Sequence, residues 1–134
     1  MRLLVLIMLV VLAAPARADQ PWTDVAGAAG VYDGWASSGG TLVPVETRIE
    51  AGLDGVLHGT YRFDQDGQIF RGTLSHGRVT SPADLVFIWH DDWGYGLLAL
   101  HFEPGFERFT GAWGTLDDSA LVFPWVGIRT GTGD

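Results

Sequence analysis

The sequence contains no cysteine, no lysine and no asparagine, and it has only one long apolar run. Without cysteine the chain can form no disulfide and carries no site for cysteine-linked lipid, so its core alone must stabilise the fold. The apolar run, Leu3 to Leu12, is ten residues long. A transmembrane helix needs about 20 apolar residues, so this run is too short to be one.

The N-terminus has the pattern of a secretory signal peptide. Arg2 precedes the apolar run, and the small-residue segment Ala16-Arg17-Ala18 follows it. We expect cleavage after Ala18, a mature chain that begins at Asp19, and a periplasmic or secreted location. The expected organisation is a signal peptide (1–18), a lead-in (19–29), a β-barrel domain (30–130) and a C-terminal tail (131–134).

Negative charge predominates. The chain has 8 arginines against 16 acidic residues, and removal of Arg2 and Arg17 leaves 6 against 16, a net charge of −10. This balance argues against nucleic acid or an anionic membrane as a partner. The acidic residues form no block, so we interpret them as a solvated surface.

Turn signals rich in glycine and aspartate recur along the chain, and no segment shows apolar residues at helical spacing. Short strands between regularly spaced turns are typical of a sandwich or barrel. The simplest topology for sequential strands is an up-and-down meander. We therefore predict an all-β, eight-stranded antiparallel up-and-down barrel. The expected strands are 30–35, 41–50, 56–63, 68–74, 84–90, 95–103, 108–115 and 120–129.

Four segments alternate a large residue, a glycine and another large residue on one strand face. They are Leu57-x-Gly59-x-Tyr61, Phe70-x-Gly72-x-Leu74, Phe109-x-Gly111-x-Trp113 and Trp125-x-Gly127-x-Arg129. Glycine inside a strand permits a sharp bend or the close approach of another side chain. These repeats favour a small closed barrel over a flat sandwich.

The stretch from Ala29 to Phe63 resembles the opening of the avidin and streptavidin family. Gly30-Val31-Tyr32, Gly40-Thr41 and Asp54 to Tyr61 stand where that family has Gly-x-Trp, Gly-Ser-Thr and Asp-Gly-x-Leu-x-Gly-Thr-Tyr. The resemblance implies an eight-stranded meander barrel that binds a small molecule among aromatics and can form homo-oligomers. Further along, Trp89, Phe109-Thr110-Gly111 and Trp125 match the family's order and spacing.

The departures from this family concern its ligand. In that family an asparagine, a serine and a tyrosine form hydrogen bonds with the ureido group of biotin. The present sequence has no asparagine, Gly40 replaces the serine, and only Tyr61 remains. Each missing partner of a buried polar ligand costs about 1–3 kcal/mol, so we do not expect tight biotin binding. Lipocalins also open with Gly-x-Trp, but they are longer and often contain paired cysteines.

The segment Trp89-His90-Asp91-Asp92-Trp93-Gly94-Tyr95-Gly96 combines titratable and aromatic residues. Asp-x-x-Gly is ordinary turn chemistry, so we expect residues 91–94 to form a loop, with His90 across from Tyr95 and Trp89 facing inward. Trp89 is then the residue of this segment best placed to contact a ligand.

Other candidates for chemistry are better explained by structure. Asp64 to Gly67 begins like a calcium loop but lacks the later acidic ligand, and Ser75-His76-Gly77 is expected to be a turn. His58 and His101 would bind a metal only if their strands met, and the expected pairing places His101 across from Asp84.

We therefore expect a binding protein that is not an enzyme, with no metal and no cofactor. A small apolar or planar ligand would be walled by Tyr61, Trp89, Phe109, Trp113 and Trp125. The alternative is a solid barrel whose loops bind another exported macromolecule, as an inhibitor or envelope adaptor would. The two hypotheses differ in whether the aromatic rings surround an empty volume or fill it.

Overall fold

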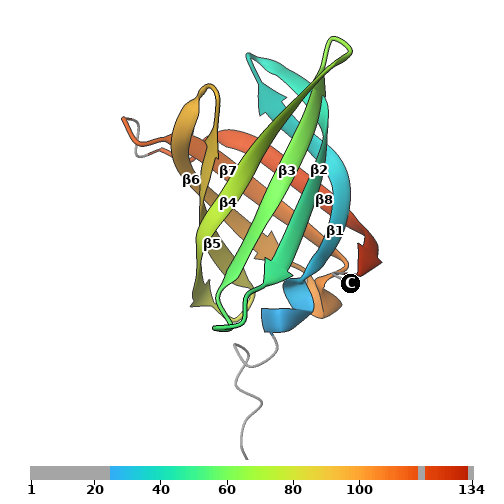
Figure 1. The fold of residues 1–134 in the computed structure, drawn as a ribbon, viewed down its shortest axis with the longest axis vertical. Coiled ribbons are helices and arrows are strands. Elements are labelled where there is room, and N and C mark those ends of the chain that lie inside the picture. The colour runs from blue at the N-terminus through green and yellow to red at the C-terminus, as the bar shows by residue number, and fades with distance from the viewer. Residues whose placement is uncertain (1–24, 118–119, 133–134) are drawn as a thin grey trace, which may run out of the picture.

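The computed structural model describes residues 25–117 and 120–132 and shows a closed barrel of eight antiparallel strands, each paired with its sequence neighbour and β1 with β8 (Figure 1). The strands are β1 (Gly30–Ser38), β2 (Thr41–Ala51), β3 (Leu57–Gln65), β4 (Gln68–Ser81), β5 (Asp84–Asp91), β6 (Gly94–Phe102), β7 (Arg108–Thr115) and β8 (Phe123–Thr132). The all-β, eight-stranded up-and-down prediction is confirmed. The expected signal peptide, residues 1–18, lies outside the described residues.

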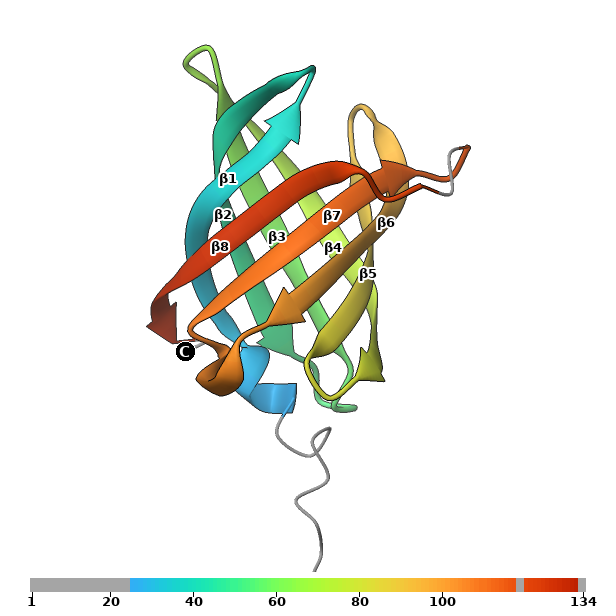
Figure 2. The same ribbon diagram turned by 180° about the vertical axis from the view of Figure 1, so that it is seen from behind.

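The two ends of the barrel differ. At one end, which we call the open end, lie the turns that join β1 to β2, β3 to β4, β5 to β6 and β7 to β8. At the other, the closed end, lie two 3₁₀ helices, η1 (Val25–Ala28) and η2 (Pro104–Phe106), as Figure 2 also shows. Within the described residues, no helix is long and apolar enough to cross a membrane.

Inward and outward residues alternate as the sequence predicted. Leu85, Phe87 and Trp89 on β5 are buried, and so are Leu98, Leu100 and Phe102 on β6. The glycine repeats lie on the same inward rows. Gly34 shows how closely the strands approach where β1 meets β8, because a Cβ there would lie 1.9 Å from the carbonyl oxygen of Val126.

The expected turn at His76-Gly77 is wrong. β4 continues through it to Ser81, and the pairing with β5 shifts by one residue between Ser75 and Arg78, which is a β-bulge. His76 takes a positive φ of 55° in this bulge. A bulge absorbs one extra residue without ending the strand, so β4 continues past His76-Gly77. The chain reverses instead between Ser81 and Asp84.

Candidate functional site

The closed half of the barrel is filled with aromatic side chains. Tyr32, Phe102 and Phe109 make edge contacts with ring centroids 5.2–5.9 Å apart, and Phe106 of η2 packs on Phe102 at 5.3 Å. Arg129 of β8 closes this end over the Tyr32 ring, 5.1 Å from its centroid. Side chains therefore fill this half of the interior.

The open half contains a cavity of about 320 Å³. Its existence follows from small inward side chains on β1 and β2, because Ala36, Val43 and Val45 face it there. Four of the six tryptophans line it. The full lining is Ala36, Ser37, Ser38, Gly39, Val43, Val45, Tyr61, Phe63, Gln65, Trp89, Asp91, Trp93, Trp113 and Trp125.

Three of the four tryptophans are held in place by their indole N–H groups. Trp89 donates to the Gly114 carbonyl at 3.0 Å, Trp113 to the Ser37 carbonyl at 3.2 Å, and Trp125 to the Thr47 hydroxyl at 2.9 Å. Because these donors already have partners, the indoles offer a ligand their ring surfaces rather than a hydrogen bond.

Tyr61 forms part of the wall and owes its position to a glycine. Its ring packs edge-on against Trp125, with centroids 4.8 Å apart, and stacks near Phe63 at 6.3 Å. On the neighbouring strand a Cβ at Gly72 would lie 2.2 Å from the Tyr61 ring. The glycine in this repeat therefore makes room for a cavity-lining ring.

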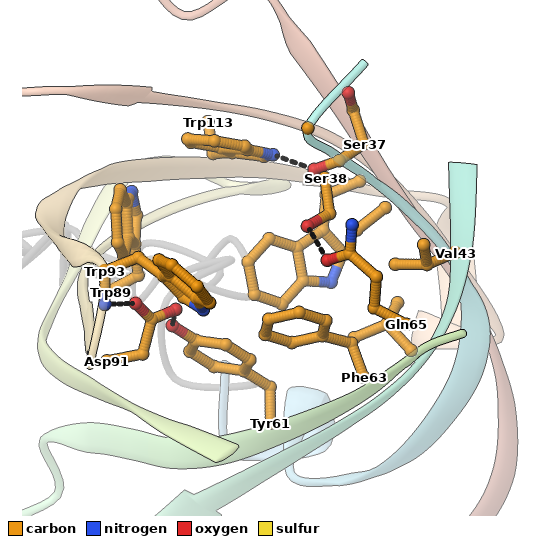
Figure 3. Close-up of a pocket in the computed structure, with 14 residues that line it drawn as sticks. Ser37, Ser38, Val43, Tyr61, Phe63, Gln65, Trp89, Asp91, Trp93 and Trp113 are labelled. Atoms are coloured by element: carbon orange, nitrogen blue, oxygen red, sulfur yellow. Dashed lines mark hydrogen bonds between the residues drawn. The ribbon is translucent and has the colours of Figure 1, made fainter. Parts of the chain in front are cut away.

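Two polar pairs lie on different sides of the cavity (Figure 3). On one side, the Tyr61 hydroxyl donates to Oδ2 of Asp91 at 2.6 Å, next to Trp89 and Trp93. On the other, the Ser38 hydroxyl donates to Oε1 of Gln65 at 2.8 Å. The cavity therefore has aromatic walls with a carboxylate on one side and a neutral hydroxyl–amide pair on the other.

Both buried tyrosines hold their protons tightly. Burial, the hydrogen bond to Asp91 and the charge of Asp91 all raise the pKa of Tyr61 far above the ordinary value of 10.0. Burial raises the pKa of Tyr32 to about 12, against an opposing effect of the Arg129 charge. At neutral pH the Tyr61 hydroxyl is therefore a fixed donor to Asp91.

These pKa values predict a loss of stability at high pH. Unfolded tyrosines ionise near pH 10.0 while Tyr32 and Tyr61 remain protonated in the folded state. The folded protein then binds more protons than the unfolded chain, so stability is complete below pH 10 and falls as the pH rises towards 12. The variant Tyr95→Phe leaves Tyr32 and Tyr61 as its tyrosines. Urea denaturation of this variant across the pH range measures the loss of stability, and phenolate absorbance measures the ionisation of the two tyrosines. Phenolate absorbance that develops near pH 10 while the protein is still folded would contradict the prediction.

The structure brings together four of the five residues predicted to contact a ligand. Tyr61, Trp89, Trp113 and Trp125 line the cavity. Phe109 does not, and its placement in the wall needs correction, because it lies near the start of β7 and is buried at the closed end. Strand direction could have shown this, since β7 runs from the closed end to the open end.

Several cavity residues were not predicted. Asp91 is the last residue of β5 and Trp93 lies in the β5–β6 turn, which is a turn as expected, with His90 paired to Tyr95. Oδ1 of Asp91 accepts a hydrogen bond from the backbone N–H of Trp93 at 2.8 Å and so orders this turn. Gln65 lies beside the β3–β4 turn. The signal that could have found them is that both turns lie at the same end of a meander.

The remaining titratable residues lie elsewhere. His101 pairs with Asp84 as expected, 2.7 Å from its carboxylate, and the Ser81 hydroxyl also donates to Asp84. This places the carboxylate between hydroxyl and imidazole, which is not the order of a nucleophilic triad. His58 lies on β3, which does not pair with β6. Among the described residues, no three His, Asp or Glu side chains converge on a common point.

Comparison of the chain with models of known protein families, with curated proteins and with solved structures finds no match. The function must therefore be argued from the cavity itself.

Proposed function

We propose that the protein is an exported, non-enzymatic binder of a small ring-bearing molecule, held among aromatic side chains at the open end of the barrel. The observation that carries this proposal is the cavity, in which rings surround a volume of about 320 Å³. Ligand sites are typically concave, of roughly 300–1,000 Å³, with mostly apolar walls and a few polar groups. A volume at the lower end of this range suits a ligand of one or two rings.

The preorganised walls support a binding role. The indole hydrogen bonds of Trp89, Trp113 and Trp125 hold their rings in the free protein, so a ligand need not order them. The alternative of a solid scaffold that binds a macromolecule through its loops requires rings that fill the interior. The cavity favours the small-ligand hypothesis. Export is part of the proposal and depends on the predicted signal peptide.

The experiment that tests the proposal is a ligand screen on the chain that begins at Asp19. Tryptophan fluorescence and thermal shift report on binding, because four of the six tryptophans line the cavity. The screen contains mono- and bicyclic compounds of each charge, with biotin among them. The expected result is saturable binding of at least one ring compound. Failure of every compound to bind the folded protein would contradict the proposal.

Trp93 provides the most direct mutational test of the site. Its side chain lines the cavity but is 71 % exposed, so Trp93→Ala should leave the fold intact. Loss of one aromatic contact of about 1 kcal/mol should weaken ligand binding roughly fivefold. Trp35→Ala is the matched control, because Trp35 is also exposed, at 52 %, and does not line the cavity. Isothermal titration calorimetry measures the ligand affinity of both variants. Equal affinities of Trp93→Ala and Trp35→Ala would place the ligand outside this cavity.

A further inference from the structure

We infer that the ligand is an aromatic ammonium ion whose cationic group lies beside Asp91. This inference rests on the proposed function and specifies the chemical class of the ligand. Asp91 is the single charged side chain among the described residues that line the cavity.

Asp91 has unused capacity to accept hydrogen bonds. Oδ2 accepts a hydrogen bond from the Tyr61 hydroxyl at 2.6 Å, and Oδ1 accepts one from the backbone N–H of Trp93 at 2.8 Å. A carboxylate offers about four acceptor positions, so about two remain. In the described part of the chain, no arginine or histidine nitrogen lies within 4.0 Å of Asp91. Residues 25–117 and 120–132 therefore supply no cation to this charge.

Aromatic rings surround the same carboxylate. Trp89, Trp93 and Tyr61 lie with Asp91 on one side of the cavity (Figure 3). The face of an aromatic ring carries negative potential and attracts an ammonium group, most strongly when the ring is tryptophan. A cation at this position is thus stabilised by both the carboxylate and the rings.

The rest of the cavity suits the body of such a ligand. Trp113, Trp125 and Phe63 offer apolar ring surface, and the Ser38–Gln65 pair offers neutral polar contacts. An anionic ligand would meet the like charge of Asp91 and no compensating cation among the described lining residues. A neutral ligand would leave the Asp91 charge unpaired in a partly desolvated site.

The turns at the open end add a field of the same sign. Asp66, Asp92 and Asp117 lie in these turns, and the segments 39–40, 66–67, 92–93 and 116–122 contain no arginine. Arg62 on β3 and Arg71 on β4 lie with Asp91 along a neighbouring groove outside the cavity; Arg62 forms an ion pair with Glu46 at 3.1 Å, and neither arginine forms one with Asp91. Acidic groups around a low-dielectric opening raise the local concentration of cations.

Three probes with the same ring and chain length test the charge preference directly: phenethylammonium, 2-phenylethanol and phenylacetate. We expect calorimetry on the unaltered protein to rank them in that order of affinity. The ammonium ion should bind about tenfold or more tightly than the alcohol, as expected of a charge-assisted contact. This comparison requires no variant and so does not depend on the folding of a mutant.

Asp91→Asn then assigns the preference to one side chain. The substitution removes the charge but keeps one oxygen that can accept a hydrogen bond, so the ratio of ammonium affinity to alcohol affinity should fall about tenfold. Asp92→Asn is the matched control, because it removes the same charge from the adjacent residue and Asp92 does not line the cavity. It should leave ammonium affinity within about twofold.

The outcomes separate the two proposals. If the alcohol or the anion binds as tightly as the ammonium ion, or if Asp91→Asn weakens the alcohol and the ammonium ion equally, the ammonium inference is overturned and small-ligand binding stands. If none of the three probes binds while other screened compounds do, the same conclusion follows. If no compound binds the folded protein, both proposals fail.

Discussion

Replacement of Arg129 by methionine should lower the free energy of unfolding by about 3–5 kcal/mol. Its guanidinium donates to the carbonyls of Phe106 at 3.1 Å, Ala29 at 2.9 Å and Gly27, and to the Tyr32 hydroxyl at 2.8 Å. These bonds join β8 to η1, to η2 and to the start of β1. Methionine keeps much of the side chain's length but donates no hydrogen bond, so it leaves these acceptors without their cation.

Urea denaturation measures this loss, and Arg108→Met is its control. Arg108 makes one exposed ion pair, with its Nε 3.4 Å from the Glu103 carboxylate. Exposed pairs contribute about 0–1 kcal/mol, so the control should lose less than about 1 kcal/mol. Equal losses in the two variants would show that Arg129 does not hold the closed end of the barrel together.

Trp125→Ala should both destabilise the fold and impair ligand binding. The side chain is 4 % exposed, so its truncation should cost about 3–5 kcal/mol of stability. Trp125 also lines the cavity and supports the Tyr61 ring at 4.8 Å. Loss of a buried ring at the centre of a binding site should lower the affinity about tenfold or more for any ligand found in the screen.

Trp125→Phe separates the role of the ring from that of its hydrogen bond. Phenylalanine keeps an aromatic wall but leaves the fully buried Thr47 hydroxyl without the indole N–H. The expected cost is about 1–3 kcal/mol of stability, with most of the ligand affinity retained. Denaturation and calorimetry on both variants provide the test. If Trp125→Ala unfolds more easily yet binds as well as the unaltered protein, the ring serves packing only and the loop-binding hypothesis gains support.

Periodicity predicted most of the fold because the two faces of a strand are determined locally. Side chains alternate between faces with a period of two, so Phe87 and Trp89 could be assigned inward without knowledge of any partner strand. Turn chemistry located most connections in the same way. It failed at His76-Gly77, where His76 takes the positive φ of a bulge and Gly77 makes room for the Leu57 carbonyl, because a glycine marks a turn and a close approach of two strands alike in a sequence.

The composition and alternation of the sequence by themselves determined an acidic, cysteine-free β-barrel whose interior is rich in aromatic rings. Only the tertiary structure decided which rings line a cavity. Strand direction orders Phe109 and Trp113 along β7, but the depth of each along the barrel depends on how all eight strands are staggered and tilted, so only the closed barrel places the edge of the cavity between them. The contact between Asp91 and Tyr61, 30 residues apart in the chain, likewise exists only because the barrel closes around it.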